Sequence, residues 1–201
     1  MKEKIRSAIE IYNKIAKIYA DYTFDRLFQF QLNKFISMLP KNGSVLDAGC
    51  GSGRDTAYFK EEGLKAIGID ESDAMLEEAK KRVDGDFKKM NILKLNFKDQ
   101  TFDGLWCMAT LADIEKKHNT KAVKEFNRVL KKDGVLYMAV KEGDGEKFII
   151  KEEYGNIERF YSFYRQEELE NLLKNSGFQI LNSMVSDDQG TKWVEVFAKK
   201  L

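Results

Sequence analysis

The chain has 201 residues, of which 43% are hydrophobic and 33% are charged. This balance is typical of one folded globular domain and excludes a disordered chain. Lysine and arginine number 34 against 33 aspartates and glutamates, so the net charge of +1 lacks the basic excess of an obligate nucleic-acid binder. No apolar run approaches the roughly 18 residues that span a membrane. The first residues lack an apolar signal core, so we expect a cytoplasmic protein.

Two helical patterns come first in the chain. Apolar residues recur near helical spacing over residues 4–20 and again over residues 25–39. We interpret residues 1–40 as an N-terminal helical cap over a ligand site, with packing against a sheet edge as the open alternative. Tyr12 and Tyr19 then either face an acceptor from this cap or belong to the core, where aromatic residues at helical spacing usually lie.

Strand and helix patterns alternate from residue 44 onward, as is typical of a parallel sheet covered on both faces. The strands are expected at 45–48, 66–69, 87–90, 102–107 and 135–140, and the helices at 55–62, 72–83 and 119–132. Ser72 is the predicted N-cap of the second of these helices. Residues 146–165 have no clear period. A helix over 166–176 and a hairpin of strands 178–185 and 193–198, with a turn at 187–190, end the chain.

A glycine-rich loop, Asp47-Ala48-Gly49-Cys50-Gly51-Ser52-Gly53-Arg54, joins the first strand to the next helix. Its glycines permit a sharp turn and close approach to a ligand, and the helix that follows offers free N–H groups. The spacing is not the dinucleotide fingerprint, because Arg54 stands where the third glycine is required, and no phosphate-binding Gly-Lys-Ser/Thr follows. Asp47 would repel a pyrophosphate but suits a cationic amino group.

An acidic residue, Asp70, ends the second predicted strand, 21 positions after Gly49. A carboxylate there can accept hydrogen bonds from both hydroxyls of a ribose. The loop and Asp70 together indicate a ligand with a ribose, a positive part and no phosphate. S-adenosylmethionine fits that description.

Four segments, in the right order, resemble the motifs of class I S-adenosylmethionine-dependent methyltransferases: 45–53, 68–76, 102–106 and 130–136. The resemblance covers residues 44–141. It implies an α/β fold, a doubly wound and mostly parallel seven-stranded sheet with an antiparallel C-terminal hairpin. Residues 1–201 then form a single domain: the cap over 1–40, a cofactor-binding core over 44–141 and a substrate side over 142–201.

The resemblance also implies where the cofactor binds. Its methionine part is expected along Gly49, Cys50 and Gly51, with Asp47 near the amino group. Arg54 either reaches the cofactor carboxylate or pairs with its neighbour Asp55. The adenosine and sulfur end is expected against seven further residues: Asp70, Glu71, Ser72, Met75, Asn91, Ile92 and Met108. Of these, Asp70 takes the ribose hydroxyls, and the amide of Asn91 stands where the family usually has an acidic residue.

Methyl transfer from a sulfonium is an in-line displacement that depends mainly on proximity and orientation. Asp113 stands where related sequences often have histidine, and it either acts on the acceptor or caps a helix. Asp113 and Tyr164 are the predicted catalytic residues, and both, together with Tyr12, Tyr19 and Tyr161, are the predicted substrate contacts. No metal is expected, because two cysteines and one histidine are too few for a zinc site.

The leading hypothesis is a methyltransferase for a small-molecule acceptor, which releases S-adenosylhomocysteine. No Asn/Asp-Pro-Pro-Tyr/Phe element follows the fourth strand, as it would in base-amino methyltransferases, since Pro40 is the chain's only proline. Two alternatives stay open: a tRNA methyltransferase acting on an exposed modified base, and a non-catalytic S-adenosylmethionine-binding protein.

Overall fold

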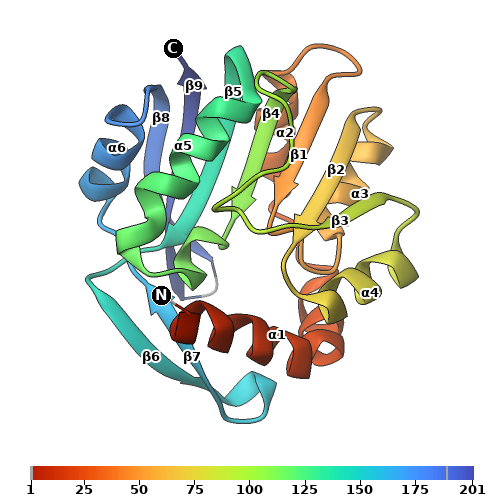
Figure 1. Ribbon diagram of the computed structural model, residues 1–201, viewed down its shortest axis with the longest axis vertical. Coiled ribbons are helices and arrows are strands. Elements are labelled where there is room, and N and C mark those ends of the chain that lie inside the picture. The colour runs from red at the N-terminus through yellow and green to blue at the C-terminus, as the bar shows by residue number, and fades with distance from the viewer. Residues whose placement is uncertain (1, 189) are drawn as a thin grey trace.

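A seven-stranded sheet forms the centre of the computed structural model, which describes residues 2–188 and 190–201. Gln189 of the predicted turn lies outside the described residues. The strand order is β3-β2-β1-β4-β5-β9-β8, and β9 alone runs antiparallel to its neighbours (Figure 1). The strands are β1 (Ser44–Ala48), β2 (Lys65–Asp70), β3 (Asp86–Lys89), β4 (Phe102–Met108), β5 (Leu130–Lys141), β8 (Phe178–Asp188) and β9 (Thr191–Lys200). The predicted sheet with its antiparallel hairpin is confirmed.

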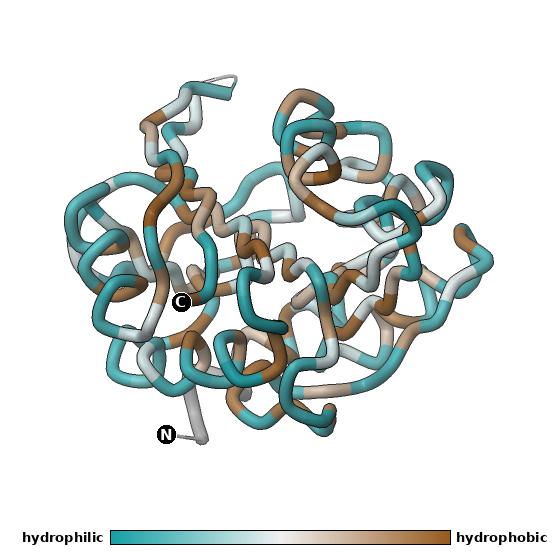
Figure 2. The backbone as a smooth tube through the Cα atoms, turned by 90° about the horizontal axis from the view of Figure 1, so that it is seen from above, coloured by the Kyte–Doolittle hydropathy of each residue, from teal (hydrophilic) through white to brown (hydrophobic). Residues whose placement is uncertain are grey.

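Helices cover both faces of this sheet. On one face, α2 (Gln29–Ser37) and α3 (Arg54–Glu61) pack against Trp106 and Tyr137, whose rings stack with centroids 3.9 Å apart. On the other face, α5 (Asn119–Val129) and α6 (Gln166–Lys174) pack against Leu105 and Leu136. Neighbouring residues of a strand point to opposite faces, so β4 and β5 serve both layers. Figure 2 shows hydrophobic residues concentrated in the middle of the molecule.

The first helix, α1 (Lys2–Thr23), lies across the carboxyl ends of the parallel strands (Figure 1). One side of it contacts α4 (Asp73–Arg82), where the Ser72 hydroxyl donates to Asn13 Oδ1 over 2.7 Å and Arg82 pairs with Asp21 over 2.5 Å. Its other side contacts β7 (Ile157–Ser162). No helix in residues 2–188 and 190–201 is both long and apolar enough to cross a membrane.

A second, two-stranded sheet of β6 (Glu146–Lys151) and β7 occupies the segment for which the sequence predicts no regular structure. The hydrophobic pattern conceals these strands because it is partly inverted. Phe148 and Ile150 of β6 are 48% and 62% exposed, whereas Arg159 of β7 is buried. Three short 3₁₀ helices, η1 (Leu111–Asp113), η2 (Lys116–His118) and η3 (Glu152–Tyr154), complete the fold.

Two predicted boundaries differ from the structure. The helix expected over 119–132 ends at Val129, because Leu130 already pairs with Phe102 of β4 and starts β5. The second N-terminal helix covers only Gln29–Ser37 instead of 25–39, while α1 continues to Thr23.

Candidate functional site

Two adjoining cavities open at the carboxyl ends of the strands, under α1. We call the smaller one the first cavity and the larger one the second cavity. Seven residues line both: Tyr12, Tyr19, Gly49, Gly51, Met108, Ala109 and Asp113. They meet between β1 and β4, where the strand order reverses, which is the usual ligand position in doubly wound sheets.

The glycine loop forms the floor shared by the two cavities. Gly49 and Gly51 have φ angles of 81° and 53°, in the left-handed region that favours glycine. A Cβ on Gly49 would lie 2.0 Å from Thr110 Oγ1, so this position also has no room for a side chain. The N–H groups of Gly49 and Cys50 both donate to the Ile69 carbonyl of β2. The backbone is therefore fixed in a sharp turn against the cavity.

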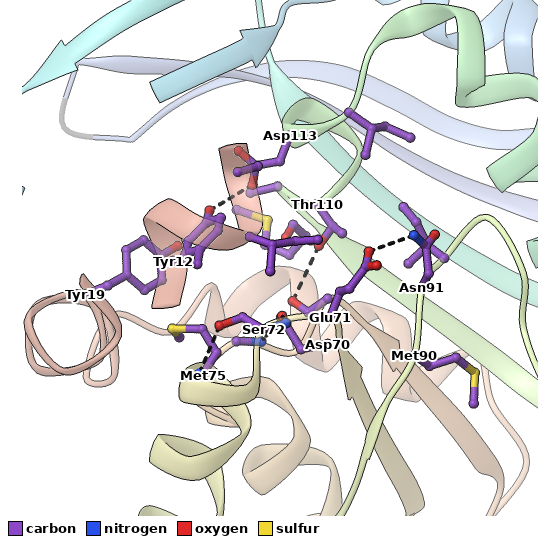
Figure 3. A pocket seen from close by; sticks show the side chains of 18 residues that line it. Tyr12, Tyr19, Asp70, Glu71, Ser72, Met75, Met90, Asn91, Thr110 and Asp113 are labelled. Carbon is purple, nitrogen blue, oxygen red and sulfur yellow. Dashed lines mark hydrogen bonds between the residues drawn. The ribbon is translucent and has the colours of Figure 1, made fainter. Parts of the chain in front are cut away.

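Asp70 joins the glycine loop to the turn after β2 (Figure 3). Its two oxygens accept the N–H groups of Gly51 over 3.0 Å and Ser72 over 2.9 Å. Burial raises the pKa of Asp70 to about 6, while these N–H donors oppose the rise. Each oxygen retains a lone pair, so this carboxylate fits the hydroxyls of a ribose. Ser72 Oγ accepts the N–H of Met75 over 3.2 Å, which confirms the predicted N-cap.

The far wall of the first cavity combines apolar side chains with one amide. Met75, Met90 and Ile92 line it, a surface that suits the faces of a planar ring such as adenine. Asn91 donates from Nδ2 to Glu71 over 2.7 Å and accepts the N–H of Leu93 over 2.7 Å (Figure 3). Its amide is thereby held in one orientation, with one oxygen lone pair left for a ligand.

Asp47 lies beneath the glycine loop and lines neither cavity in the described structure. It is 2% exposed, and its Oδ2 accepts the Thr56 hydroxyl over 2.6 Å. Burial, with a further contribution from the Asp55 charge, raises the pKa of Asp47 far above the usual range for a carboxyl. A cation placed nearby would therefore favour its ionised form.

Arg54 lines the second cavity, but its guanidinium is already bonded to protein groups. It pairs with Asp55 over 2.6 Å and donates to the Arg26 carbonyl over 2.8 Å. The alternative pairing considered for Arg54 is thus present, although it is buried and not at the surface. Cys50 also lines the second cavity, and its thiol is buried.

A buried ion pair crosses the second cavity. Arg159 of β7 donates to Asp113 Oδ1 over 3.1 Å, and the Tyr12 hydroxyl of α1 donates to Asp113 Oδ2 over 2.8 Å. Arg159 also donates to the Tyr12 oxygen. The guanidinium carbon lies 4.5 to 5.9 Å from the centroids of four rings: Tyr12, Tyr19, Tyr154 and Tyr161. Asp113 makes no helix cap, so that alternative is wrong; its carboxylate joins α1 to β7.

The predicted role of Tyr164 in the site is wrong. Tyr161 lines the second cavity as predicted, but Tyr164 is 1% exposed and packs in the core beneath α6 with Leu169 and Leu173. Its hydroxyl has no hydrogen-bond partner among the described residues. Side chains along an extended chain alternate between its two sides. Tyr161 and Tyr164 are an odd number of positions apart, so they point in opposite directions. The structure supports neither a catalytic nor a substrate role for Tyr164.

Sequence reasoning missed several lining residues. In the first cavity they include Ala8, Ile9 and Thr110; in the second they include Lys141, Arg159 and Trp193. Lys141 carries a usable signal, because it is a cation at the end of the apolar run Val135–Val140. Arg159 carries none, since nothing local marks it as buried.

Known proteins share this architecture. Residues 46–138 match the family described as methyltransferase domain. An uncharacterised protein of Methanocaldococcus jannaschii is 32% identical over 174 residues, which cover 86% of this chain and 70% of that protein. The ubiquinone/menaquinone biosynthesis C-methyltransferase of Campylobacter jejuni is 28% identical over 193 residues, covering 87% of this chain and 76% of the relative.

A solved structure shows the same fold. It is the 1,6-didemethyltoxoflavin-N1-methyltransferase of Burkholderia thailandensis with bound 1,6-didemethyltoxoflavin and S-adenosylhomocysteine. It superposes with a TM-score of 0.75 at 23% identity, covering 98% of this chain and 86% of that one. The sheet order, the glycine loop and the matched domain agree with one another. The chain belongs to the class I S-adenosylmethionine-dependent methyltransferases, and it is an enzyme with S-adenosylmethionine as its cofactor.

Proposed function

We propose that this enzyme methylates a small molecule held in the second cavity. The observation that carries the proposal is the wall shared by the two cavities at Gly49, Gly51 and Met108. A cofactor in the first cavity would present its methyl group at this wall, and an acceptor in the second cavity would meet it there. Bringing the two reactants together in this way supplies much of the rate enhancement of a displacement reaction.

We assign the first cavity to the adenosine part of the cofactor. Asp70 would accept the ribose hydroxyls, and Met75 and Ile92 would contact the adenine faces, with Glu71 and Asn91 at the edge. The methionine part would follow Gly49, Cys50 and Gly51 toward the second cavity, with Met108 beside the sulfur. Asp47, under the loop, would stabilise the ammonium group through its charge.

When bound, S-adenosylmethionine would supply an activated methyl group for displacement by a lone pair of the acceptor, with the thioether of S-adenosylhomocysteine as the leaving group. The chain's own residues position the partners and exclude water. Asp113 is not proposed as a base, because Arg159 neutralises it and Tyr12 occupies its second oxygen. These three residues hold α1 closed over the site instead. An acceptor proton would leave to solvent.

The shape and lining of the second cavity support a small acceptor. Residues of α1, β7 and β9 border it, and seven aromatic side chains line it: Tyr12, Tyr19, Tyr22, Phe28, Tyr154, Tyr161 and Trp193. We extend the proposal to the domain organisation: residues 1–40 cap the site, 44–141 hold the cofactor and 142–201 supply the acceptor side. Two of the proteins named above are a 1,6-didemethyltoxoflavin-N1-methyltransferase and a methyltransferase of ubiquinone/menaquinone biosynthesis, which agrees with a small acceptor.

Incubation with methyl-labelled S-adenosylmethionine and a metabolite extract tests the proposal. Label should enter the small-molecule fraction with the wild-type enzyme and drop strongly with Asp70→Ala. Label in a separately added tRNA fraction would support the tRNA alternative instead. No labelled product in either fraction, from a protein that binds S-adenosylhomocysteine, would overturn the proposed function.

A further inference from the structure

Lys141 is a cation of the second cavity that forms no ion pair with any residue that the structure describes. Three of the four carboxylates that line this cavity are already paired: Asp55 with Arg54, Asp113 with Arg159, and Glu153 with Lys151. The fourth, Asp188, is exposed and forms no ion pair with Lys141. Lys141 ends β5, and its ammonium lies 4.2 Å from the centroid of the Tyr161 ring. Among the described residues, no carboxylate lies within ion-pair distance of it.

A second buried donor lies on the strand paired with that of Lys141. Trp193 of β9 is directly opposite Lys141 in the antiparallel register, so the two side chains project from the same face of the sheet. Both line the second cavity. Trp193 is 9% exposed, and its indole N–H is buried with no acceptor in the part of the chain that the structure describes. A buried donor of this kind usually has a ligand or water that satisfies it.

These two donors indicate the chemistry of a ligand that this part of the cavity would bind. An ammonium and an indole N–H on paired positions of two neighbouring strands can each donate to one oxygen of a carboxylate. A single unpaired cation balances one negative charge, whereas a phosphate dianion would leave one charge without compensation. The surrounding tyrosine and tryptophan rings favour a flat aromatic body on the same molecule. Burial, with Lys151 and Arg159 nearby, lowers the pKa of Lys141 to about 8, so most of it is still charged at neutral pH.

We propose that the methyl acceptor is an aromatic carboxylic acid whose carboxylate binds Lys141 and Trp193 and whose ring lies against Tyr161. The inference rests on the proposed function of the second cavity. The carboxylate does not react; it fixes the ring so that another atom of the acceptor faces the shared wall. The two donors thus set specificity, while the cofactor cavity is untouched.

Calorimetry on the complex with S-adenosylhomocysteine tests this without requiring turnover. The probes are benzoate, 4-hydroxybenzoate and indole-3-carboxylate, each with its primary amide, plus phenyl phosphate. The carboxylates should bind at least ten-fold more tightly than the matched amides. Lys141→Met should abolish that preference, Lys141→Arg should retain it, and Trp193→Phe should reduce it several-fold. Lys124→Met, on the exposed side of α5, is the matched control and should change nothing.

Each other outcome is decisive. Equal binding of acids and amides, or equal effects of Lys141→Met and Lys124→Met, would overturn the carboxylate site. Tighter binding of phenyl phosphate than of any carboxylate would overturn the assignment in favour of a phosphate ester. Unchanged affinity for S-adenosylhomocysteine shows that each variant is folded. Because the preference is measured without methyl transfer, a failure of the labelled-methyl experiment remains distinguishable from a failure here.

Discussion

Replacing Arg159 by methionine should destabilise the protein more than any substitution of an exposed arginine. Methionine keeps an apolar stem among the tyrosine rings but leaves Asp113 without its cation. The side chains of Arg159 and Asp113 are 6% and 16% exposed, so water screens the pair little. Removing one partner of a buried ion pair costs about 3–5 kcal/mol of the free energy of unfolding.

The matched control is Arg165→Met. Arg165 pairs with Glu142 and Asp144 but is 58% exposed, and exposed pairs contribute about 0–1 kcal/mol. Asp113→Asn should also destabilise, because Arg159 then lacks a carboxylate. The double variant removes both charges. Its loss of free energy of unfolding should be smaller than the sum of the two single losses by about 0.5–3 kcal/mol.

Urea unfolding followed by tryptophan fluorescence measures these differences, provided that the slope of free energy against urea stays constant. Binding of S-adenosylhomocysteine gives a second reading, because Tyr12 lies in both the ion-pair cluster and the first cavity. Arg159→Met should weaken that binding as α1 loosens. A midpoint for Arg159→Met equal to that of Arg165→Met would refute the idea that this pair holds α1 in place.

Three further predictions concern the cofactor site. S-adenosylhomocysteine at a hundred times its dissociation constant should add about 2.7 kcal/mol of stability, seen as a raised melting temperature; no shift would contradict the cofactor assignment. Asp70→Ala should weaken its binding by about 1–3 kcal/mol in calorimetry, through lost ribose hydrogen bonds; unchanged affinity would identify another residue as the ribose acceptor. In Asp47, burial and Asp55 raise the folded-state pKa to about 8 from an ordinary value near 3.8. The free energy of unfolding therefore falls as pH rises between these values, because the unfolded chain ionises there while Asp47 stays protonated in the folded protein. Asp47→Asn should gain stability relative to wild type across that window, and equal pH profiles in urea unfolding would refute this.

The first cavity was largely predictable because most of its lining residues come from short, contiguous segments of the sequence. Asp70, Ser72 and Met75 follow one strand within six positions, and the glycine loop follows another. Parallel strands in a doubly wound sheet end at the same edge, so motifs far apart in sequence meet there. Local turn chemistry and one topological rule were enough to place these residues together.

The second cavity was not predictable in the same way. Arg159, Lys141 and Trp193 come from three strands, and their proximity depends on the register of β5 with β9 and on a separate hairpin. That hairpin exposes apolar residues and buries an arginine, which reverses the signal on which periodicity depends. Tyr164 was misplaced for a related reason, because the aromatic run offers no indication of which residues face the cavity.

The two cavities share the glycine loop and α1 but take their remaining walls from different parts of the chain. Loops after β1 to β4 supply the first cavity, while the second draws Lys141 from β5, Arg159 from β7 and Trp193 from β9. A change at Lys141 or Trp193 alters acceptor contacts without touching the cofactor wall. A change at Tyr12 or Asp113 reaches both, because these side chains line both cavities. Acceptor preference can thus change within β5 to β9 while cofactor binding persists, and α1 is the element through which the two become coupled.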